Sequence, residues 1–143
     1  MKFLIFVSLF TLAHINLANA DPINDPSKWM DNLCKEIIKD EAKGAKMVTS
    51  AMDFGNVQSQ SQIASQELAF KGAFEQAKKF YGKLETCSYG NESAIGEDLK
   101  KVAYVAKYAI LPTILEGYFV KGSSGWKVFG VSFLDQKKEY PFK

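Results

Sequence analysis

Residues 102–110 have the sequence VAYVAKYAI, in which apolar side chains recur along both faces of an extended chain. A strand turns successive side chains to opposite faces, and β-branched and aromatic residues favour strands. One face would carry Val102, Tyr104, Ala106, Tyr108 and Ile110, and the other Ala103, Val105, Lys107 and Ala109. We therefore predict a strand here, with at least one face buried.

The flanking residues predict further strands. Residues 114–121 are rich in β-branched and aromatic side chains, and Gly-Ser-Ser-Gly at 122–125 is typical of a hairpin connection to a returning strand at 126–134. Upstream, apolar and polar residues alternate over 83–89, Gly90 and Asn91 predict a turn, and 94–98 predict a loop. Together these segments predict a curved antiparallel sheet of about four strands.

The first half of the chain has a helical periodicity, with apolar residues every three or four positions. Asp25 and Pro26 are a favourable helix start, and apolar positions from Trp29 to Val48 predict one helix of about five or six turns that ends near Met52. A second helix is predicted over 63–81, and Gly82 stands where a left-handed cap would end it. The expected fold is α+β, with two N-terminal helices packed on the sheet.

The first twenty residues predict export. A short positive start is followed by an apolar run at 3–13, and Ala18-Asn19-Ala20 places small residues where signal peptidase cleaves. The run is shorter than the roughly 20 residues needed to cross a bilayer. We interpret residues 1–20 as a signal peptide and 21–143 as a single α+β domain, periplasmic or secreted, with no membrane span.

Composition excludes several functions. The only histidine is His14, inside the predicted signal peptide, and all eighteen basic residues are lysine. After cleavage the chain would contain seventeen lysines and sixteen acidic residues, a balance that gives no basic surface for nucleic acid. Without histidine, two-histidine zinc sites and Ser-His or Cys-His nucleophilic sites cannot form in the mature protein. We expect no cofactor, no metal and no nucleic-acid partner.

Cys34 and Cys87 are the only cysteines. In an oxidising compartment an even number of cysteines predicts a disulfide, which here would join the first helix to the first strand. The alternative is two buried thiols that pack as small apolar groups.

Four segments in the second half of the chain together give the order helix, glycine, strand, tyrosine-rich strand and hairpin. They are FYGKLE at 80–85, LKKVAYVAKY at 99–108, GYFVK at 117–121, and GWKV at 125–128 with Val131 and Phe133. This order resembles small exported bacterial proteins of the nuclear-transport-factor-2-like (NTF2-like), cystatin-like superfamily. The resemblance implies a cone-shaped α+β domain, often dimeric, with a cavity between helices and sheet. Members include isomerases, dehydratases and binding modules, so function stays open.

Glu116 is the candidate acid–base residue because it lies inside a predicted strand, on the face of Tyr118. If that face lines the cavity, Glu116 would act as a base in proton transfer of the isomerase or dehydratase type. Tyr104 or Tyr108 would then donate a hydrogen bond to the developing oxyanion. The alternative interpretation places Glu116 in water beside a lysine of the neighbouring strand and the tyrosine hydroxyls at the rim of the core.

Two functional hypotheses follow. We favour a non-enzymatic exported domain that binds a small apolar ligand in the helix–sheet cavity, or an envelope protein on the exposed face of the sheet. That free face would also suit a homodimer. The alternative is the cavity enzyme with Glu116 as base.

Overall fold

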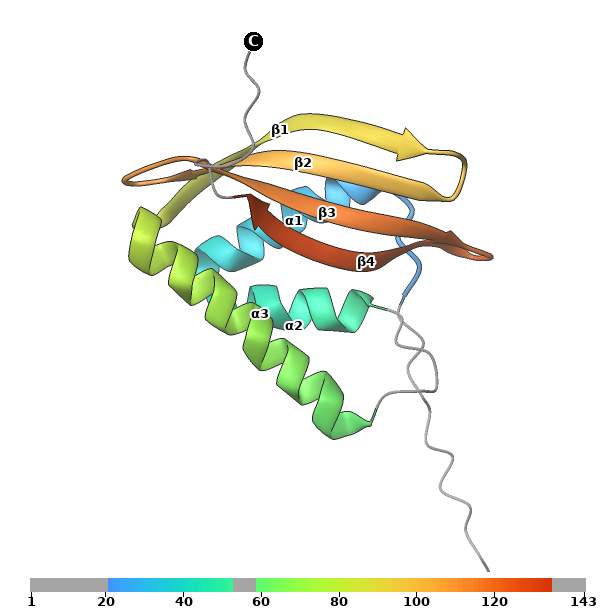
Figure 1. Cartoon of the computed structure of the whole chain (residues 1–143), viewed down its shortest axis with the longest axis horizontal. Coiled ribbons are helices and arrows are strands. Elements are labelled where there is room, and N and C mark those ends of the chain that lie inside the picture. The colour runs from blue at the N-terminus through green and yellow to red at the C-terminus, as the bar shows by residue number, and fades with distance from the viewer. Residues whose placement is uncertain (1–20, 53–58, 135–143) are drawn as a thin grey trace, which may run out of the picture.

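The centre of the fold is an antiparallel sheet whose strands follow one another in chain order (Figure 1). In this computed structural model the described residues are 21–52 and 59–134. The helices lie on one side of the sheet. The described elements are α1 (Pro26–Lys39), α2 (Glu41–Ala51), α3 (Gln60–Tyr81), β1 (Leu84–Ile95), β2 (Leu99–Tyr108), β3 (Thr113–Gly122) and β4 (Gly125–Leu134). The α+β class and the sheet are confirmed, whereas the predicted signal peptide lies outside the described residues.

The single long helix predicted from residue 26 to about residue 52 is wrong, because the chain breaks it at Asp40. The backbone of Asp40 is extended, with φ −165° and ψ 122°, and its N–H donates to the carbonyl of Glu36 at the end of α1. Its side chain accepts a hydrogen bond of 2.9 Å from the amide of Ala42. Aspartate is a preferred N-cap, so the same residue ends α1 and starts α2. The apolar periodicity continues on both sides of Asp40, so the sequence pattern does not reveal the break.

The predicted end of α3 is confirmed. Gly82 follows the helix with φ +84°, a conformation that favours glycine. A Cβ at this position would also lie 3.1 Å from that of Ala109. At the other end, Ser59 and Gln62 form a reciprocal capping box.

The turn predicted at Gly90 and Asn91 is wrong, because β1 continues through both residues. The register with β2 shifts between Tyr89 and Asn91, which is the mark of a β-bulge. A Cβ at Gly90 would lie 3.0 Å from the carbonyl oxygen of Ala103, so glycine allows the close approach. The glycine therefore bends the strand and does not reverse it.

Strand alternation assigns each residue of the sheet to the helix-covered face or to the outer face. Leu115 and Phe119 of β3 are buried on the helix-covered face. Between them, a Cβ at Gly117 would overlap the sulfur of Met30, so α1 lies directly against β3. Glu116 alternates with these residues and therefore projects from the outer face.

The helices cover the sheet unequally. Helix α1 contacts β1, β2 and β3, and α2 contacts β4, whereas α3 packs mainly on α2. The last helix therefore stands off the sheet, and its inner side approaches β4 through the edge-to-face pair of Phe74 and Phe133, with ring centroids 5.6 Å apart. This arrangement leaves space between α3 and β4.

Candidate functional site

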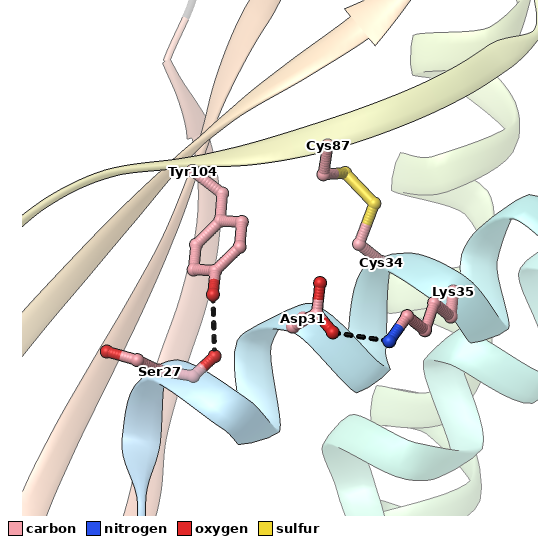
Figure 2. Close-up of a disulfide and its surroundings, with 6 residues drawn as sticks. All are labelled: Ser27, Asp31, Cys34, Lys35, Cys87 and Tyr104. Carbon is pink, nitrogen blue, oxygen red and sulfur yellow. Dashed lines mark hydrogen bonds and ion pairs between the residues drawn. A yellow bond between two sulfur atoms is a disulfide. The ribbon is translucent and has the colours of Figure 1, made fainter.

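The predicted disulfide between Cys34 and Cys87 is confirmed. It joins the middle of α1 to β1, with a Cα–Cα distance of 6.3 Å (Figure 2). Closer to the start of α1, the hydroxyl of Tyr104 donates a hydrogen bond of 2.8 Å to the carbonyl oxygen of Ser27. The disulfide and this hydrogen bond both hold α1 on the sheet. Because both cysteines are in the disulfide, neither is a free thiol.

Glu116 is buried although it projects from the outer face, and 6% of its side chain is exposed. The hydroxyl of Tyr118 donates a hydrogen bond of 2.6 Å to the carboxylate, and Nζ of Lys101 on β2 lies 3.2 Å from it. This hydrogen bond, together with burial, raises the pKa of Tyr118. The neighbouring lysine of the alternative interpretation is present, but the carboxylate is covered and not in water.

Tyr104 and Tyr108 project from the opposite face of the sheet, toward the helices. The hydroxyl of Tyr104 is used in the contact with Ser27, and burial, with a smaller effect of Asp31, raises its pKa. Tyr108 is 3% exposed, and its hydroxyl has no hydrogen-bond partner among the described residues. Because Glu116 and the tyrosines lie on different faces, the structure does not bring the three together around one substrate position.

The space between α3 and β4 forms a groove of about 450 Å³, which we call the α3–β4 groove. A volume of this size is in the range of small-molecule sites. Most of its lining is apolar or aromatic: Met52, Ala69, Phe70, Ala73, Phe74, Phe129, Gly130, Val131 and Phe133, with Gln66 and Ser132 as the polar members. The groove lies between α3 and the edge strand β4 of the sheet.

One polar atom in the groove has an unusual environment. The side-chain oxygen Oε1 of Gln66 is buried and accepts no hydrogen bond within the described residues. Buried acceptors in proteins are normally satisfied. Gln66 was missed in the sequence, although it stands three residues after Ile63 and four before Phe70, on the apolar stripe of α3. A polar residue on an otherwise apolar stripe is the sequence signal that could have marked Gln66 as a candidate binding residue.

Two other hollows are present in the described part of the chain. The larger, about 600 Å³, lies between residues 21–25 and the helices α1 and α2, with a mixed lining that includes Asp25, Lys28 and Trp29. The smaller, about 250 Å³, lies where α1, α2, α3 and the ends of β1 and β2 meet. We call the smaller one the lysine-rich cleft, since Lys39, Lys78 and Lys83 line it.

Residues 21–52 and 59–134 contain neither a metal-binding group of side chains nor a helix that could span a membrane. No group of three or more His, Cys, Asp or Glu side chains there is placed to hold a metal ion. None of the helices in the same ranges has the length and apolar character to cross a membrane.

Comparison with known proteins identifies the fold. No family model matches the chain, and no curated protein matches it in sequence. Among solved structures, it is similar to a Campylobacter jejuni protein described as an NTF2-like transpeptidase, with a TM-score of 0.58 and 15% sequence identity. The alignment covers 73% of this chain and 97% of the other. The chain therefore has an NTF2-like fold, as the resemblance in its second half implies.

Proposed function

We propose that this protein is an exported, non-enzymatic binding domain that holds a small apolar ligand in the α3–β4 groove. The observation that carries the proposal is the unpartnered Oε1 of Gln66 inside an otherwise apolar groove. Ligand sites typically combine apolar walls with a few polar groups that orient the ligand. The ligand that fits this chemistry is largely apolar and has one hydrogen-bond donor.

The walls of the groove suit an aromatic or branched aliphatic group. Phe74 and Phe133 meet edge to face at one wall, and Phe70 adds a third ring. Ala69 and Ala73 leave room beside them because their side chains are short. Burial of apolar ligand surface in such a groove contributes about 25 cal/mol per Å² before the entropic cost of binding.

Export is part of the proposal. It is supported by the signal-peptide pattern of residues 1–20 and by the Cys34–Cys87 disulfide, a bond typical of oxidising compartments. The other hypotheses have weaker support. A base at Glu116 would work without Tyr104 or Tyr108, which lie on the other face of the sheet. A protein partner or a second copy on the outer face has no comparable observation among the described residues.

The test uses 1-N-phenylnaphthylamine, a neutral aromatic probe with one N–H donor whose fluorescence rises in apolar sites. Saturable binding to the purified, disulfide-bonded protein is expected. The variant Ala73→Trp should abolish binding because the indole fills the groove. Gln66→Leu should weaken binding roughly fivefold, the effect of losing one neutral hydrogen bond.

The matched control is Ala64→Trp, an equal change at an exposed position of α3 that does not line the groove. This variant should bind the probe as the unmodified protein does. Absence of saturable binding, or equal binding by Ala73→Trp, would show that the groove is not the ligand site.

A further inference from the structure

The lysine-rich cleft contains a second unpartnered polar group, the hydroxyl of Tyr108 at the end of β2. The ring is held in place by packing against Tyr81, with centroids 5.8 Å apart. Tyr104, on the same face of the strand, donates a hydrogen bond from its hydroxyl to a backbone carbonyl oxygen. A buried hydroxyl in a protein core normally has such a hydrogen-bond partner. The hydroxyl of Tyr108 is thus a buried donor that lines a hollow.

The side chains around this donor have an excess of positive charge. Lys39, Lys78 and Lys83 line the cleft, against one carboxylate, that of Glu41. Lys78 is paired with Glu41 at 2.9 Å, and Lys39 is paired at 2.7 Å with Glu36, which lies outside the cleft lining. Lys83 forms no ion pair with any described residue. The charge of Lys83 is therefore uncompensated and leaves the lining with a positive excess. This excess acts against the repulsion between the Glu41 carboxylate and a bound anion.

We propose that the lysine-rich cleft binds a small oxyanion, with the Tyr108 hydroxyl as hydrogen-bond donor and Lys83 as the main charge partner. The space of about 250 Å³ admits a compact ion and excludes a bulky ligand. Burial and the nearby Glu41 carboxylate raise the pKa of Tyr108, so the hydroxyl remains protonated and able to donate. Phosphate and short carboxylates share the required chemistry, namely negative charge and several acceptor oxygens.

This site is independent of the proposed apolar ligand. The α3–β4 groove lies on the β4 side of α3, whereas the cleft lies toward the ends of β1 and β2. The linings share the buried residue Phe74 and no other residue. Failure of either proposal leaves the other standing.

The experiment measures the melting temperature, and the shifts of the backbone amides of Glu41 and Lys83 by NMR, during titration with sodium phosphate or sodium acetate. Sodium chloride at equal ionic strength is the reference. A saturable response at millimolar concentration is expected for at least one oxyanion, and the salt that produces it identifies phosphate or carboxylate as the class. A response that only rises linearly, as general salt effects do, would overturn the proposal.

Tyr108→Phe keeps the ring and removes only the donor. Without oxyanion this variant should melt at the same temperature as the unmodified protein or higher, because no hydrogen bond to a described residue is lost. It should lose most of the oxyanion response, and Lys83→Gln should weaken binding severalfold. The matched control is Tyr104→Phe, which should melt lower in every salt and keep the full response. A full response in both Tyr108→Phe and Lys83→Gln would overturn the proposal.

Discussion

Glu116 and Tyr108 are both buried polar residues, but their surroundings differ. Glu116 has two partners on the outer face of the sheet, the hydroxyl of Tyr118 and the ammonium of Lys101. Tyr108 has no hydrogen-bond partner within the described residues. A satisfied buried group contributes to stability, whereas an unsatisfied one is unfavourable unless a ligand completes it. At the scale of single residues, these surroundings favour a structural role for Glu116 and support the proposed binding role of Tyr108.

The substitution Glu116→Gln tests the structural role. It keeps the shape of the side chain but removes the charge that Lys101 and Tyr118 contact, so the free energy of unfolding should fall by about 1–2 kcal/mol. Urea denaturation measures the change. Glu85→Gln, at an exposed position of β1, is the control and should be neutral. Loss of probe binding in the α3–β4 groove by Glu116→Gln would contradict this assignment.

At the scale of elements, the junction of α1 and α2 depends on one side chain. Asp40 ends the first helix through its backbone and starts the second through its carboxylate. The break redirects α2 toward β4, whereas α1 lies on β1, β2 and β3. A continuous helix would leave part of the sheet without cover.

The substitution Asp40→Ala should lower the free energy of unfolding by about 1 kcal/mol, because the amide of Ala42 loses its cap. Chemical denaturation with circular dichroism at a helix wavelength measures the loss. Asp31→Ala removes an acid inside α1 that forms only a surface pair with Lys35, so a smaller change is expected there. Equal effects of the two variants would show that the cap is unimportant.

The ion pair of Glu41 and Lys78 joins α2 to α3 and makes their packing dependent on pH. The hydrogen bond from Lys78 holds the pKa of Glu41 below its ordinary value of 4.5. The folded state therefore favours the carboxylate, and the stabilisation is present above that value and lost as pH falls through the lower, folded-state pKa.

Comparison with Glu41→Gln measures this contribution. The unmodified protein should be the more stable of the two at about pH 7, and the difference should shrink as the pH is lowered to about 3. Melting temperatures over this range provide the measurement. A difference that is the same at both ends of the range would mean that the charge of Glu41 makes no contribution.

At the scale of the whole molecule, one disulfide cross-links the helices to the sheet. The Cys34–Cys87 disulfide connects α1 to β1 across a sequence separation of 53 residues. Such a link restricts the unfolded chain, which by the chain-entropy model stabilises the folded state by about 4 kcal/mol. This is a large share of the roughly 5–15 kcal/mol typical of a domain.

The double variant Cys34→Ala/Cys87→Ala should therefore lose about 4 kcal/mol of unfolding free energy in urea. Treatment of the unmodified protein with a reductant is the companion measurement, since it opens the link without changing side-chain volume. An unchanged denaturation midpoint after complete reduction would contradict the prediction.

The secondary structure was predictable wherever the signal was local. Gly82 ended α3 as expected, and the Gly-Ser-Ser-Gly connection joined β3 to β4. The errors arose where two local patterns look alike. Asp40 interrupts a helical periodicity that continues on both sides of it, and Gly90 is compatible with a turn or with a bulge. Only the pairing of β1 with β2 shows that Gly90 is part of a β-bulge and not of a turn.

The amino-acid sequence alone was sufficient for the α+β class and the antiparallel sheet, because periodicity and turn chemistry depend on near neighbours. The cysteine count favoured a disulfide over two buried thiols, and the structure was needed to decide between them. Packing was needed to place the candidate sites. Alternation shows that Glu116 and Tyr118 share a face of β3, but not that the helices cover the other face. The unpartnered atoms of Gln66 and Tyr108 likewise depend on distant segments, since a hydrogen bond is absent only relative to everything that surrounds the atom.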